Sequence, residues 1–127
     1  MDKYYIPTLE EFHVGFEYEV YVPQKDIWSK EIFYLNTSHI NLVKYVNLQD
    51  VFTIPIRVKY LDEEDIESFG FVKYNIKNIT VYIRNNINLY WFNDSYLSID
   101  KGDTQYFRGN IKNKSELKRI LTQIGYD

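Results

Sequence analysis

The stretch from Ile54 to Phe71, IPIRVKYLDEEDIESFGF, is the most restrictive part of this sequence. Apolar side chains alternate with other residues over its first eight positions, which is the period of a strand with one buried face. Asp62 then begins a run of four acidic residues, as is typical of a helix N-terminus, where carboxylates accept hydrogen bonds from free amides. Gly70 can take the left-handed conformation that ends a helix. We therefore predict a strand, a short helical turn and a second strand.

A hairpin is predicted where two further alternating runs, residues 79–83 and 87–91, follow each other closely. Opposite residues of an antiparallel pair share a face, so we pair Ile83 with Ile87 through a three-residue loop. A two-residue turn would place Ile83 opposite Asn88, and we reject it on register grounds.

The N-terminal half contains the clearest amphipathic strand, Phe12–Val22, in which apolar and polar side chains alternate. Gln24–Lys30 has the composition of a polar loop. Glu31–Leu35 and His39–Val46 are each predicted to form a short strand.

The C-terminal segment predicts a second hairpin and one helix. The hairpin has its loop at Asp100–Gly102, and its return strand places Phe107 on the face of Ile99. Asn113 is a suitable N-cap, with Glu116 three residues later completing a capping box. Four residues beyond the cap form a single apolar stripe: Leu117, Ile120, Leu121 and Ile124.

These elements predict an α+β fold with one domain over residues 1–127. Six to eight strands form a mainly antiparallel twisted sheet or partial barrel, and the C-terminal α-helix packs on it. The composition agrees, because the chain has no alanine, the best helix former, and 13 tyrosines, which favour strands.

Charge and composition exclude several classes of function. The net charge of −3 offers no overall positive field for duplex nucleic acid. Without cysteine, the chain can form neither a disulfide framework nor a thiolate metal site. Neither a signal peptide nor a membrane-spanning apolar run is recognisable, so we expect a cytoplasmic protein. We see no cofactor motif and no glycine-rich phosphate loop, and expect no enzymatic activity.

One weak metal or acid–base site is conceivable on the N-terminal strand. The alternation places His13, Glu17 and Glu19 on the same face, where an imidazole and two carboxylates could hold a cation or transfer protons. The alternative is the ordinary solvent face of an amphipathic strand, and we favour that interpretation.

Arginines interleaved with tyrosines form a second candidate site. Arg57, Arg84 and Arg108 lie on the polar sides of predicted strands or at the first hairpin. Three neighbours share these faces and complete the set of candidate ligand-binding residues: Lys59, Tyr82 and Tyr106. A guanidinium grips phosphate in two places and stacks on rings, so the set would suit an anionic ligand with an aromatic base, such as a nucleotide. Alternatively, the arginines sit apart and pair with the acidic residues after Tyr60.

Tyrosine-rich surfaces and open sheet edges both favour protein contacts. Tyrosine combines apolar area with a polar tip and is enriched at interfaces, and an open edge invites strand pairing. We therefore expect a host protein or small anionic ligand as partner, with self-association as a further option.

Three segments carry a resemblance to a known group: IPTLEEFHVGFEYE (Ile6–Glu19), IRVKYLDEEDIESFGF (Ile56–Phe71) and GNIKNKSELKRIL (Gly109–Leu121). In these segments the chain resembles uncharacterised small proteins of gut Bacteroidales phages and prophages. The group has no assigned activity, so the resemblance transfers no site residue. It implies a phage gene translated in the host bacterial cytoplasm.

Three functions compete at this point. The first is a non-enzymatic binding protein that counters host defence by sequestering a nucleotide-type signal or blocking a host protein. The second is a structural or assembly component of the phage virion. The third, which we rank last, is a small hydrolase or metal enzyme using His13, Glu17 and Glu19.

Overall fold

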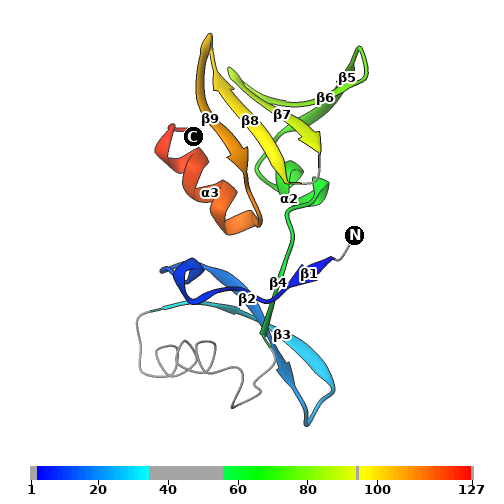
Figure 1. Cartoon of the computed structure of the whole chain (residues 1–127), viewed down its shortest axis with the longest axis vertical. Coiled ribbons are helices and arrows are strands. Elements are labelled where there is room, and N and C mark those ends of the chain that lie inside the picture. The colour runs from blue at the N-terminus through cyan, green and yellow to red at the C-terminus, as the bar shows by residue number, and fades with distance from the viewer. Residues whose placement is uncertain (1–2, 35–55, 94, 127) are drawn as a thin grey trace. The chain divides into compact units, whose positions relative to one another are not determined.

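The computed structural model describes residues 3–34, 56–93 and 95–126 (Figure 1). The chain divides into two compact units, Met1–Lys59 and Tyr60–Asp127. Each unit contains one antiparallel sheet, of four and five strands respectively, so the expected single sheet of six to eight strands is wrong. The mainly antiparallel character and the C-terminal helix are confirmed, whereas the single domain over residues 1–127 stays a prediction. Within the described ranges, no helix has the length and hydropathy needed to cross a membrane.

The first unit holds a four-stranded sheet in the order β1-β4-β2-β3. Its elements are β1 (Tyr4–Tyr5), the 3-10 helix η1 (Leu9–Glu11), β2 (Glu17–Val22), β3 (Ile27–Ile32) and β4 (Ile56–Lys59). A small aromatic core lies on one face of this sheet, built from Phe16, Tyr18, Phe33, Ile56 and Val58.

Two sequence expectations for this unit need correction. The strand predicted over Phe12–Val22 begins only at Glu17, because a turn at Val14 and Gly15 precedes it. The Gly15 amide donates to the Phe33 carbonyl at 2.9 Å. The loop predicted over Gln24–Lys30 is also too long, since β3 begins at Ile27 and continues the hairpin. The strand predicted over His39–Val46 lies outside the described residues.

The predicted corner after β4 is confirmed. Helix α2 (Glu63–Ser68) follows Asp62, whose side chain accepts from the Asp65 amide at 2.9 Å. The Asp65 carboxylate accepts in return from the Asp62 amide at 3.2 Å, so two free donors of the first turn are satisfied together. Gly70 has a φ of +88°, the left-handed conformation expected after the helix.

The second unit contains a five-stranded antiparallel meander in the order β5-β6-β7-β8-β9. The strands are β5 (Val72–Ile76), β6 (Ile79–Arg84), β7 (Ile87–Asn93), β8 (Tyr96–Lys101) and β9 (Thr104–Asn110). Strands β5 and β9 stand at opposite ends of the order, so the sheet is open and does not close into a barrel.

Helix α3 (Lys114–Gln123) covers one face of this sheet, as predicted, and lies beside β9 in Figure 1. Asn113 caps it by accepting from the Glu116 amide at 2.8 Å. The core of the unit includes residues of both helices, of the three strands β6, β7 and β8, and of the segments between elements: Leu61, Ile66, Phe71, Tyr82, Ile87, Leu89, Leu97, Ile99, Ile111, Leu117 and Leu121. We call this helix-covered side the inner face.

The hairpin between β6 and β7 has the register that the sequence analysis rejected. Arg84 pairs with Ile87 and Ile83 pairs with Asn88, so the turn has two residues, Asn85 and Asn86. The pairing of Ile83 with Ile87 is therefore wrong. Its premise fails because β6 is apolar on both sides, and its core-facing residue is Tyr82, which is 3% exposed and faces Leu89.

In the hairpin between β8 and β9, Phe107 lies on the same face as Ile99, as predicted. Ile99 pairs with Phe107 on the inner face. The loop is shorter than predicted, because Lys101 pairs with Thr104 and leaves Gly102 and Asp103 as the turn. The register shifts after Ile99, which marks a bulge in this ladder.

Candidate binding surface

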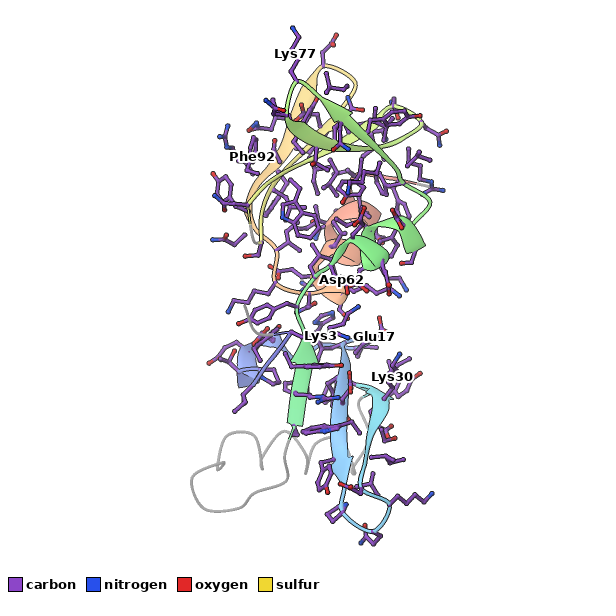
Figure 2. The ribbon with its side chains drawn as sticks, turned by 90° about the vertical axis from the view of Figure 1, so that its right-hand side faces the viewer. Lys3, Glu17, Lys30, Asp62, Lys77 and Phe92 are labelled. Carbon is purple, nitrogen blue, oxygen red and sulfur yellow. The ribbon has the colours of Figure 1, made fainter. Side chains whose placement is uncertain are left out.

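The second side of the five-stranded sheet, here called the outer face, is covered by neither α2 nor α3. The strand registers, together with the alternation of side chains along β7 and β9 where Phe92 and Tyr106 stand unpaired at the two register shifts, place fifteen residues on it: Val72, Tyr74, Ile76, Ile79, Val81, Ile83, Asn88, Tyr90, Phe92, Tyr96, Ser98, Asp100, Tyr106, Arg108 and Asn110. In Figure 2, Phe92 lies on the side of the sheet away from the helices, and Lys77 marks the tip of the β5–β6 hairpin.

Large apolar side chains on the outer face are exposed to an unusual degree. Val72 is 56% exposed, Ile76 53% and Tyr106 54%. Tyr74, Ile79 and Phe92 are each close to half exposed. Their β-branched and aromatic character suits a pleated surface, but no described helix or strand of the second unit packs over them. Two smaller residues of this face, Val81 and Ser98, are nearly buried, at 3% and 4% exposed.

Arg108 stands among aromatic rings on this face. Its Nε donates to the Tyr96 hydroxyl at 3.2 Å. The guanidinium carbon lies 5.2 Å from the centre of the Phe92 ring, within the range of a cation–π contact. The Phe92 and Tyr96 rings are themselves 5.9 Å apart. These contacts orient the guanidinium at the surface, where it remains exposed.

The outer face carries little net charge. Asp100 and Arg108 are the charged residues among its fifteen positions, and the rest are aliphatic, aromatic or small polar residues. One acid and one base cannot provide the cluster of cations that phosphate-rich ligands require. An apolar partner surface suits this face better than an anionic ligand does.

The structure separates the predicted arginine set. Arg57 and Lys59 lie on β4 in the first unit, whereas the remaining members lie in the second. Arg57 Nη2 forms an ion pair with Glu19 Oε1 at 2.9 Å. The guanidinium also lies between two rings, 3.7 Å from the Tyr4 centroid and 4.0 Å from that of Trp28. The structure thus gives Arg57 a packing role in its own sheet.

Within the second unit, two predicted members lie on the wrong face. Tyr82 is part of the inner core, and burial raises the pKa of its phenol, with the negative charge of Glu63 adding to the effect. Arg84 also points to the inner face, with its guanidinium carbon 4.8 Å from the Tyr126 ring. Because Arg84 and Arg108 lie on opposite faces of one sheet, they cannot share a ligand. Of the predicted set, Arg108 and Tyr106 remain on an open surface.

The weak metal site is not assembled. His13 precedes the turn before β2, and its Nδ1 lies 2.9 Å from the Glu11 carbonyl oxygen. Its ring packs near Phe16, at 5.6 Å between centroids. Glu19 forms an ion pair with Arg57. Across the part of the chain that the structure describes, no three histidine, aspartate or glutamate residues gather as metal ligands.

Most residues of the outer face carry no signal of a binding site in the sequence. Val72, Tyr74, Tyr90, Phe92 and Tyr96 are not among the candidate residues that the sequence pattern indicates. The available signal is that β6 and β7 carry large apolar residues on both faces while the chain offers one convincing helix to cover them. Comparison of the chain with protein-family models, curated proteins and solved structures finds no match.

Proposed function

We propose that this chain is a non-enzymatic binding protein that recognises a protein partner through the outer face of its five-stranded sheet. One observation carries the proposal: six large, exposed apolar side chains gather on this face, namely Val72, Tyr74, Ile76, Ile79, Phe92 and Tyr106. Large apolar side chains exposed together on one face of a sheet favour an interaction site, because leaving them in water is unfavourable.

The chemistry of the face supports a protein partner over a nucleotide. Tyrosine, phenylalanine and arginine are enriched in protein interfaces, whereas lysine and glutamate are depleted there. The outer face contains the first three types and neither of the last two. Arg108, held by Tyr96 and beside Phe92, is the kind of anchored side chain that often dominates binding energy.

The resemblance to small proteins of Bacteroidales phages and prophages supplies the setting for this proposal. A phage protein translated in the host cytoplasm meets host proteins first. We therefore propose that the partner is a host protein of the defence machinery and that occupation of its surface blocks it. The proposal rests on the exposed sheet face together with this resemblance.

The test compares surface variants in a lysate of the host bacterium. The double variant Phe92→Ser and Tyr106→Ser should lose the captured partner, whereas Tyr34→Ser, which removes an equally exposed aromatic ring from the first unit, should keep it. With the purified partner, calorimetry should show roughly 30-fold or weaker binding by the double variant. Equal affinity of all three proteins would contradict the proposal.

A second measurement separates the protein partner from a nucleotide. Melting temperatures are recorded with mono-, di- and cyclic nucleotides for the natural protein and for Arg108→Ala. We expect no ligand-induced rise in either protein. A rise that the arginine substitution abolishes would assign the outer face to a nucleotide instead and overturn the proposal.

A further inference from the structure

Strand β5 forms one edge of the five-stranded sheet, and no described strand pairs with its other side. All of its residues, Val72–Ile76, are exposed. Backbone amides and carbonyls along such an edge can pair with another strand, so natural proteins protect edges with prolines, bulges, charges or very short strands.

The other three edges of the two sheets carry such protection. Strand β1 has only two residues, and β3 has Lys30 and Glu31 side by side. Strand β9 is interrupted by the register shift opposite β8. Strand β5 has no proline, and its register with β6 is unbroken. Its one charged residue, Lys73, is neutralised by an ion pair in which Nζ lies 2.8 Å from Glu63 Oε1, and this is the single protective feature of the edge.

The turn after β5 fixes which backbone groups face the open edge. Lys77 and Asn78 form a two-residue turn with φ values of 49° and 68°. In such a turn the carbonyl before it accepts from the amide after it, so the backbone groups of Ile76 face β6. Because this direction alternates along a strand, Lys73 and Asn75 point their amides and carbonyls to the open edge.

We propose that a second copy of this chain pairs with β5 in antiparallel orientation, with the two-fold axis at Tyr74. Lys73 then pairs with Asn75 of the second copy, and Asn75 with Lys73, which gives four backbone hydrogen bonds. Tyr74 meets Tyr74 at the non-hydrogen-bonded pair on the axis, where opposite side chains approach most closely.

Self-complementarity selects a second copy as the occupant. In this register Val72 faces Ile76, tyrosine faces tyrosine, and no like charges are directly opposite. A two-fold interface needs one patch that matches itself, and β5 meets that condition over its whole length. Pairing would join two five-stranded sheets edge to edge. The dimer does not rest on the proposed function, because its hydrogen bonds come from the strand edge.

A charge exchange at Tyr74 tests the register. Because an edge pairing buries less area than a standard interface, sedimentation is measured at concentrations on the order of 100 µM, where the natural protein should be dimeric. Each single variant, Tyr74→Glu or Tyr74→Lys, should form its own homodimer with an affinity lower by roughly tenfold or more, since like charges meet on the axis. An equimolar mixture of the two should recover association as a mixed dimer. A monomeric natural protein, or a mixture that stays dissociated, would overturn the proposal.

A proline variant tests the hydrogen bonds themselves. Asn75→Pro removes the amide that faces the open edge and keeps the bonds between β5 and β6, so the dimer dissociation constant should rise roughly 30-fold. Asn75→Ala keeps the amide and should dimerise like the natural protein. Binding by the proline variant that equals that of the alanine variant would overturn the edge pairing.

Discussion

The two faces of the five-stranded sheet have similar apolar chemistry and opposite environments. On the inner face Leu89, Leu97 and Ile99 are 0% exposed. On the outer face Val72 and Ile79 are 56% and 49% exposed, although both side chains are as apolar as those in the core. The difference is the cover that α2 and α3 provide on one side. Apolar patterning on this sheet therefore indicates burial on one face and, in our proposal, binding on the other.

The largest effect is expected in the stability of two alanine variants, one at an aliphatic residue of each face. Leu89→Ala should lower the free energy of unfolding by about 2–5 kcal/mol, because it leaves a cavity in a fully buried site. Ile79→Ala removes a half-exposed side chain and should cost less than about 1 kcal/mol. Denaturant titration of both variants measures the difference, and equal losses would show that the two faces are not distinct.

A smaller effect separates the two arginines of this sheet. Arg84 lies against Tyr126, and a Cβ added at Gly70 would come within 3.3 Å of its Nε, so the side chain fills space on the inner face. Arg84→Ala should cost about 1–3 kcal/mol of stability through lost packing. Arg108→Ala should stay within about 0.5 kcal/mol, since its side chain is exposed.

Thermal unfolding of the two arginine variants provides the comparison. The assignment of Arg84 to the inner face would be wrong if Arg84→Ala unfolded like the natural protein while Arg108→Ala was destabilised.

The elements that sequence could predict are those with local causes. Asp62 caps α2 and Asn113 caps α3 because each side chain bonds an amide three residues ahead, and such spacing is visible in the chain. The strand period of β4 was equally visible. The register at Asn85 and Asn86 was not, because β6 has Val81 on one face and Tyr82 on the other, both 3% exposed. Alternation alone cannot choose between two apolar faces.

The candidate site was predictable only where its neighbours are close in sequence. Arg108 and Tyr106 are two positions apart on β9, and both are exposed in the structure. Arg57 depends on Glu19, 38 residues away, and on rings from β1 and β3. Strand order decides those contacts. The sequence therefore indicates Arg57 as a candidate for ligand binding, whereas in the fold its guanidinium already contacts Glu19 and the two rings.

Removing a helix cap tests the comparison of the two faces, because it destabilises one of the helices, α2 or α3, that cover the inner face. Asn113→Ala should cost about 1–2 kcal/mol, because the cap is 4% exposed and the amide it satisfies would lose its partner away from solvent. Asp62→Ala, at a partly exposed cap, should cost about 0.5–1 kcal/mol. Thermal unfolding of both variants checks the order, and a larger loss at Asp62 would contradict the greater burial of the α3 cap.

The smallest expected effect is a change of stability with alkaline pH that originates on the inner face. Burial raises the pKa of Tyr82, so the folded protein holds the phenol proton more firmly than the unfolded chain does. Its contribution to stability is therefore complete below pH about 10, the ordinary value for tyrosine, and is lost as the pH rises toward the folded pKa. Tyr82→Phe should make the free energy of unfolding fall less steeply above that pH.

Tyr106→Phe serves as the matched control, because it removes a phenol from the half-exposed outer face of the same sheet. This variant should keep the alkaline decline of the natural protein. Denaturant titrations at several pH values, with tyrosinate absorbance followed in parallel, provide the measurement. A decline that Tyr82→Phe leaves intact and Tyr106→Phe removes would mean that the outer face, and not the inner one, is the covered side.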